Sequence, residues 1–150
     1  RHLGSIRAAY AELAIDLAAK NRKEEARAVL NKVDKMMHES NFGYGLTSRG
    51  NMHNKNSLLF LEACYLAEDK ILIKKVGDAV KKDLLQQIEY YNKLPFVINL
   101  GFKKLYFRID NMDDEKVEAE KYLRILGQMQ TMYNPSVEIP GKVMSKDTSR

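Results

Sequence analysis

The sequence predicts an all-α protein in which antiparallel helical hairpins stack side by side. Apolar residues recur at intervals of three and four through most of the first 133 positions, as they do on one face of a helix. The 8 Gly and 3 Pro are few for an all-β protein, which needs many turns. A length of 150 residues is that of one domain. We therefore expect a helical repeat domain over residues 1–133 and an irregular C-terminal tail over 134–150.

The first helix is predicted from about Ser5 to Lys20. The second begins within the next few residues and runs to about His38. The first carries an apolar stripe, and Asn21 with Glu24 three residues later resembles a capping box for the second. So short a connection forces the two helices into an antiparallel hairpin.

Residues 39–56 contain three glycines and four asparagines with little periodicity, which predicts a long loop. A helix apolar nearly all round is expected over Ser57–Ala67, followed by a helix over Lys70–Asn92 that ends at Leu94-Pro95. A fifth helix is expected from Pro95 to about residue 109, and a sixth to Tyr133, with a break between them at Asn111, Asp113 and Asp114. The sequence thus predicts about three hairpins.

The first hairpin also carries a repeat signature. Its pattern of Tyr10-x2-Leu13-Ala14-x2-Leu17 followed by Ala26-x3-Leu30-x2-Val33 resembles the tetratricopeptide repeat. Equivalent positions recur less regularly in the second and third pairs, at a period longer than the roughly 34 residues of that repeat. The resemblance implies a short right-handed superhelix of about three helical pairs.

A second resemblance covers about residues 7–94. It rests on "KNRKEEARAVL" in the first hairpin, "LEACYLAEDK" at the end of the third predicted helix and "EYY" in the fourth. These segments resemble the soluble C-terminal tail of a Bacteroidetes family of multi-pass membrane proteins that are similar to protein O-mannosyltransferase-type glycosyltransferases. The resemblance implies that catalysis belongs to membrane helices upstream and that this tail lies on the periplasmic face. Residue 1 is Arg rather than Met, so we expect the chain to begin inside a longer product.

Two surfaces are candidates for interaction. The net charge is +5, and five lysines form a stripe along the fourth predicted helix, which is either a solvated face or a contact for anionic lipid headgroups or an acidic partner. Repeat modules of this kind bind in the groove lined by the first helix of each pair. The stripe consists of Lys70, Lys74, Lys75, Lys81 and Lys82, and the groove candidates, which are otherwise ordinary surface residues, are Lys55, Glu62, Tyr65, Lys104 and Arg108.

The sequence offers no set of catalytic or metal-binding residues. His2, His38 and His53 lie in different elements without the ligand spacing of a zinc site, so no metal and no cofactor is expected. The acids between Asp113 and Glu120 follow one another at a predicted helix start, where they favour the helix dipole. Cys64 lies on an apolar helix and is expected to be a buried, inert thiol.

These observations predict a non-catalytic scaffold module, not an enzyme, that binds a protein or peptide. No run of about 18 apolar residues is present, so we expect a soluble fragment of a membrane-anchored protein that makes, at most, peripheral contact with the membrane surface. The alternative is a free-standing basic helical adaptor that binds nucleic acid. We do not favour it, because the positive residues are scattered among 20 acids.

Overall fold

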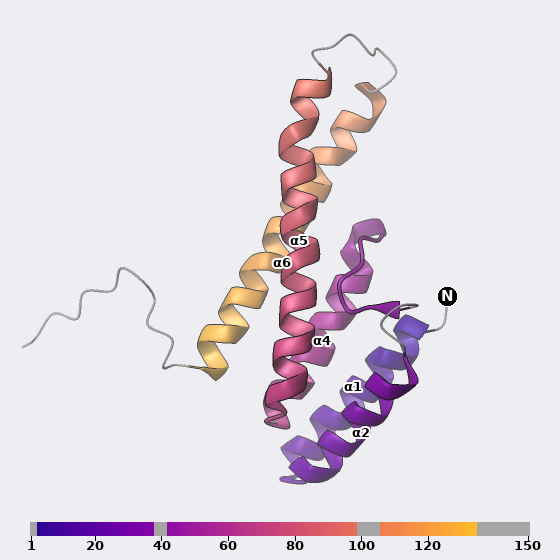
Figure 1. Cartoon of the computed structure of the whole chain (residues 1–150), viewed down its shortest axis with the longest axis vertical. Coiled ribbons are helices and arrows are strands. Elements are labelled where there is room, and N and C mark those ends of the chain that lie inside the picture. Colours follow the sequence, from indigo (N-terminus) through magenta and orange to yellow (C-terminus); the bar gives the residue numbers. More distant parts are fainter. Residues whose placement is uncertain (1–2, 38–41, 99–105, 135–150) are drawn as a thin grey trace, which may run out of the picture.

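The regular secondary structure is all helical over the residues that the computed structural model describes, which are 3–37, 42–98 and 106–134. Within these ranges there are five α-helices, one short 3-10 helix and no strand, which confirms the predicted all-α class (Figure 1). Most of the predicted tail, residues 135–150, lies outside the described residues. The elements are α1 (Leu3–Ala19), α2 (Lys23–Met36), η1 (Arg49–Asn51), α4 (Met52–Leu66), α5 (Lys70–Ile98) and α6 (Tyr106–Tyr133).

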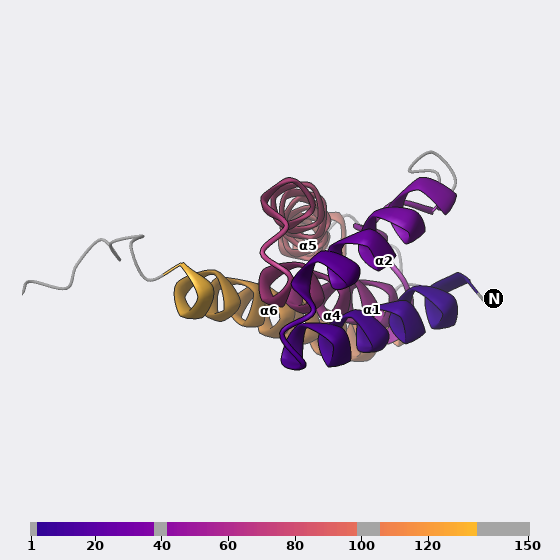
Figure 2. The same cartoon turned by 90° about the horizontal axis from the view of Figure 1, so that it is seen from below.

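The helices lie in two layers. Figure 2 shows α1, α4 and α6 in one layer, with α2 and α5 in the other. Helix α1 packs against both α2 and α4, while α4 packs against α5 and α6, and α6 also runs along α5 (Figure 1). Helix α4 is therefore the central element, which explains why its sequence is apolar nearly all round.

The core follows this arrangement. On α1 the small residues Ala11 and Ala14 are fully buried, so this face can approach its neighbours closely. Helix α4 contributes the larger side chains of Phe60 and Leu61, both also fully buried. One continuous cluster of buried apolar side chains runs from α1 through α4 and α5 to Leu126 of α6.

The turn between α1 and α2 is built differently from the prediction. Asn21 has a left-handed backbone with φ of +59°. Its N–H donates to the carbonyl of Ala18 at 3.0 Å, and the N–H of Arg22 donates to that of Leu17 at 2.9 Å. This pair of bonds closes the C-terminus of α1 as a Schellman motif. The expected capping box with Glu24 is wrong, because Asn21 ends the first helix and α2 has no side-chain cap hydrogen bond.

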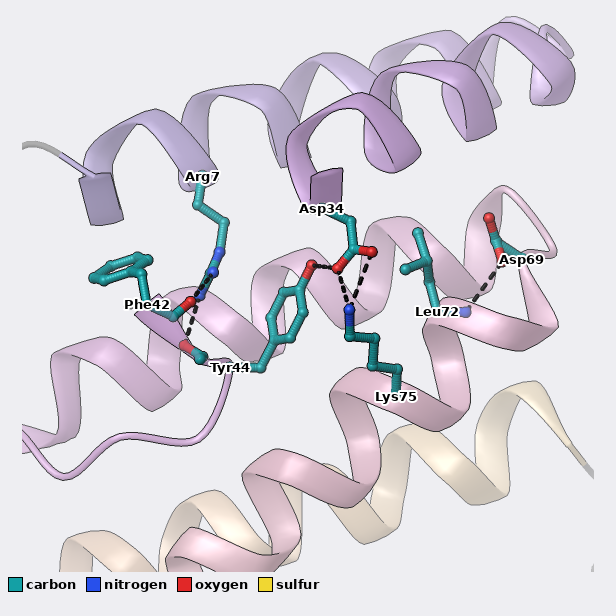
Figure 3. Close-up of polar contacts among 8 residues, drawn as sticks. Arg7, Asp34, Phe42, Tyr44, Asp69, Leu72 and Lys75 are labelled. Carbon is teal, nitrogen blue, oxygen red and sulfur yellow. Dashed lines mark hydrogen bonds and ion pairs between the residues drawn. The ribbon is translucent and has the colours of Figure 1, made fainter. Parts of the chain in front are cut away.

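The turn between α4 and α5 repeats this geometry, but its left-handed residue is a glutamate, which suits that backbone less well than asparagine does. Glu68 has φ of +58°, its N–H donates to the Tyr65 carbonyl, and the N–H of Asp69 donates to that of Cys64, both at 3.0 Å. The side chain of Asp69 then accepts the N–H of Leu72 at 3.1 Å, which caps the start of α5 (Figure 3). The predicted interruption at Glu68 and Asp69 is confirmed.

Three predicted boundaries are wrong, at the start of α4, at the end of α5 and within α6. Helix α4 begins at Met52 rather than Ser57, because His53 and Asn54, at the end of the predicted loop, are buried and hydrogen bond to partners outside the helix. Helix α5 continues past Pro95 to Ile98, since a proline removes one backbone hydrogen bond without having to end the helix there.

Helix α6 runs unbroken through Asn111, Asp113 and Asp114. Asp and Asn cost a helix interior only about 0.7 kcal/mol each, which is too little to end a long packed helix. The expected fifth and sixth helices are therefore not separated there, and residues 99–105 of the expected fifth helix lie outside the described residues.

Candidate interaction surface

Residues 43–48 cross directly over α5. A Cβ atom added at Gly45 would lie 2.2 Å from the carbonyl oxygen of Ala79 and 2.8 Å from its carbonyl carbon. No side chain fits in that space, so glycine is required for the loop backbone to touch the helix. This contact fixes one wall of the surface described below.

Arg7 of α1 holds the start of this loop (Figure 3). Its Nη2 donates to the carbonyl of Phe42 at 2.7 Å and its Nη1 to that of Gly43 at 3.1 Å. The guanidinium also lies over two rings, 4.5 Å from the centroid of Phe42 and 4.2 Å from that of Tyr44. Burial lowers the pKa of Arg7, whose side chain is 1% exposed. Such a group stays protonated, so this is a buried cation held by carbonyls and aromatic faces.

Asp34 of α2 joins the loop to α5. It accepts the Tyr44 hydroxyl at 2.8 Å and the Lys75 ammonium at 2.9 and 3.1 Å (Figure 3). The carbonyl of Tyr44 in turn accepts the Ser57 hydroxyl at 2.6 Å. Burial, and secondarily the bond to Asp34, raises the pKa of Tyr44 well above its ordinary value. Three helices and the loop are thereby tied at one tyrosine.

A second polar network lies further along α5. Asn51 and Gln87 exchange two amide hydrogen bonds, at 3.0 and 2.9 Å, and both side chains are almost fully buried. Asp83 accepts Gln87 and Asn54 at 2.7 Å each. The sequence does not predict this network, because asparagines in a glycine-rich segment are typical of a loop. The three-residue spacing of Asn51 and Asn54, typical of one helix face, was the available signal.

The predicted lysine stripe lies on α5, but its members differ. Lys70, Lys74, Lys81 and Lys82 are exposed, whereas Lys75 is half-buried and paired with Asp34. Lys74 also pairs with Asp78 at 2.7 Å. Two large apolar side chains stand among the exposed lysines. We call this surface the α5 outer face; it comprises Lys70, Ile71, Lys74, Asp78, Lys81, Lys82 and Leu85.

Three adjacent depressions mark this face, and Asp78 borders all of them. One of about 450 Å³ surrounds Ile71, and one of about 410 Å³ lies beside Lys82 and Leu85. The third, of about 540 Å³, lies between α5 and the loop at Gly45. The α5 outer face is therefore indented rather than a smooth helix surface.

The predicted groove residues do not form one site among the described residues. Lys55 is exposed on α4, but Tyr65 is buried and stacks on Tyr133 of α6 with centroids 4.9 Å apart. Burial, and then the negative charge of Glu62, raises the pKa of Tyr133. Tyr65 thus packs the end of α6 against α4. Lys104 lies outside the described residues, as does the side chain of Arg108, whose backbone belongs to α6.

A fourth cavity, of about 340 Å³, lies between residues 47–51, α5 and α6. The Tyr91 hydroxyl on its wall donates to Glu115 at 2.7 Å. Glu118 also lines it, so two of the acids expected at a helix start instead line a cavity from within α6.

The histidines and the cysteine are the remaining residues with possible chemical roles. His53 is buried, and its Nε2 donates to the carbonyl of Gly43 at 2.8 Å. Burial raises the pKa of the Cys64 thiol. His2 and His38 lie outside the described residues. Across residues 3–37, 42–98 and 106–134, no three His, Cys, Asp or Glu side chains gather as they would around a metal ion.

The helices of the described ranges are each too short or too polar to cross a membrane. Comparison with known proteins gives no match to a protein family, to a curated protein or to a solved structure.

Proposed function

We propose that this chain is a non-catalytic interaction module of the tetratricopeptide type. The observation that supports the proposal is the two-layer packing, with α1, α4 and α6 in one layer and α2 and α5 in the other (Figure 2). In a stack of helical hairpins, first helices pack on first helices while second helices line the opposite side. The contacts of α1 with α4 and of α4 with α6 follow that order.

The polar ties suit such a module to binding. Arg7, Asp34 and Tyr44 hold α1, α2 and the loop together, and Lys75 ties that assembly to α5. A surface held by buried hydrogen bonds loses little entropy when a partner binds, which favours affinity. The module would act by presenting a rigid helical face rather than by chemistry of its own.

We place this module, by its resemblance to such tails, at the C-terminus of a membrane-bound, glycosyltransferase-like protein on the periplasmic face. There it would bring a protein or peptide partner close to the catalytic domain. The coding sequence upstream of Arg1 tests this placement. Many hydrophobic spans upstream support it, and a start codon directly before Arg1 overturns it.

Photo-crosslinking tests the interaction itself. A photoreactive residue replaces Lys55 in one layer, Lys81 in the other and Gln128 on α6, each exposed, in the full-length protein in its host cells. We expect one discrete adduct at some positions and not at others. Adducts at no position, or the same mixture at all three, would overturn the interaction module.

The exposed lysines of α5 are also the basis for the alternative proposal, which is nucleic-acid binding. Such binding weakens steeply with salt, because neutralised phosphates release counterions. A gel shift that disappears as salt rises would support it, and absence of a shift at low salt would end it.

A further inference from the structure

We propose that the α5 outer face docks an acidic amphipathic segment of a partner protein, with its apolar side chains in the depressions and its carboxylates on the lysines. This inference rests on the proposed function, since it names the kind of partner that the module takes. The argument has three steps, which concern charge, apolar exposure and shape.

Positive charge on this face is only partly neutralised. Lys74 is paired with Asp78, and Lys75 with Asp34. Lys81 and Lys82 form no ion pair with any residue in the described ranges, and both are exposed. These two consecutive lysines therefore present positive charge to solvent. A carboxylate of a partner protein would complement that charge.

Apolar side chains stand exposed beside this charge. Ile71 is 81% exposed, which is the largest exposure among the large apolar residues of the described chain, and Leu85 is 46% exposed. They lie 14 positions apart, four helical turns, and so on nearly the same side of α5. Covering both removes apolar surface from water, which is the main favourable term in protein association.

The shape of the face favours a peptide over a bilayer. Separate depressions beside Ile71, beside Leu85 and against the loop at Gly45 can each receive a side chain. Asp78 at their common border and Glu89 beside Leu85 are each paired with a lysine of α5, Lys74 and Lys93, so part of this face offers no free positive charge to a uniformly anionic lipid surface. A peptide, unlike a bilayer, can carry carboxylates beside Lys81 and Lys82 alone. It need not bring any carboxylate against those of α5.

Fluorescence anisotropy with the 150-residue chain tests the proposal. The probe is a labelled helical peptide with leucine at every third and fourth position, glutamate along one flank of the leucines and glutamine elsewhere; its control has lysine in place of glutamate. We expect the acidic peptide to bind and the lysine peptide not to bind. Affinity should fall as salt rises, because the contacts are solvent-exposed charges.

Matched variants locate the contact. We expect Lys81→Glu/Lys82→Glu to weaken binding at least about tenfold, and Ile71→Ala to weaken it about fivefold. The controls are Lys121→Glu/Arg124→Glu, with the same change in charge on α6, and Val117→Ala, at a 57% exposed residue of α6. Circular dichroism checks that every variant stays folded.

Three results would overturn the docking site. They are equal weakening by both charge-reversal pairs, acidic-peptide binding that Lys81→Glu/Lys82→Glu leaves unchanged, and no peptide binding. Binding to vesicles of phosphatidylcholine and phosphatidylserine at roughly 7:3, without peptide binding, would assign the face to lipid instead. A discrete crosslink at Lys55 but none at Lys81 would leave the interaction module standing while this docking site fails.

Discussion

Gly45→Ala tests whether the loop rests on α5 as closely as described. Ordinary contact of a Cβ begins at 3.4 Å, whereas here it would lie 2.2 Å from the backbone oxygen of Ala79, which is 1.2 Å too close. The blocking atom belongs to a helix backbone and cannot rotate away. The loop must therefore move by more than an ångström.

The cost follows from what this movement breaks. The hydrogen bonds of neighbouring Tyr44 to Asp34 and from Ser57 have lengths of 2.8 and 2.6 Å and would stretch beyond bonding distance. Each is worth about 0.5–1.5 kcal/mol, and overpacking of this kind costs about 1–3 kcal/mol. Since the loop can relax partly, we expect the free energy of unfolding to fall by about 2–3 kcal/mol.

Gly127→Ala is the matched control. A Cβ at Gly127, which is exposed within α6, would meet no atom within 4 Å, so alanine should stabilise the helix by about 0.5–1 kcal/mol. Urea unfolding followed by circular dichroism measures both variants. The same substitution should thus have opposite signs at the two sites, and a Gly45→Ala variant within about 0.5 kcal/mol of the parent would refute the close contact.

Two further predictions concern the backbone and pH. Glu68→Gly should raise the Tm, since glycine adopts the left-handed backbone without strain, and the gain should exceed that of Asn21→Gly because asparagine tolerates this region better; an equal or smaller gain would contradict this reasoning. Burial lowers the pKa of His53, so the unfolded chain binds the proton at a higher pH than the folded one. The stability present above the unfolded pKa near 6.5 should therefore fall as pH drops below it, by about 1.4 kcal/mol per unit of pKa difference. Urea titrations at several pH values measure this fall, which His53→Gln should reduce, and an unchanged slope in that variant would assign it to other groups.

The helical class and the first hairpin could be predicted from the sequence, because both depend on local periodicity. The apolar stripe of α1 and the interruption at Glu68 need only neighbours three or four residues away. Boundaries that depend on distant partners could not be predicted this way. Helix α4 starts early because Asn54 finds Asp83 at 2.7 Å, a partner 29 residues on. No local pattern shows such a pairing.

Two predicted breaks failed for a related reason. Proline and consecutive acids weaken a helix locally, and a sequence pattern weighs only that local effect. In α6 the buried residues Tyr122 and Leu126 lie beyond the acids and pack into the common core. Packing of an apolar face supplies most of a helix's stability in a protein, so α6 continues through a segment that local preference would interrupt.

Distant contacts also decide which lysines of the α5 outer face present free charge. The sequence places five lysines on one helix, but Lys75 is half-buried and pairs with Asp34 of α2. The exposed lysines form one group around Ile71 and another beside Leu85, with Asp78 between them. Under the docking proposal, a partner places its acids on the second group, Lys81 and Lys82, which form no ion pair within the described residues. The ion pair that ties α5 to the first hairpin therefore neutralises one of the five lysines that the proposed partner would otherwise meet as free charge.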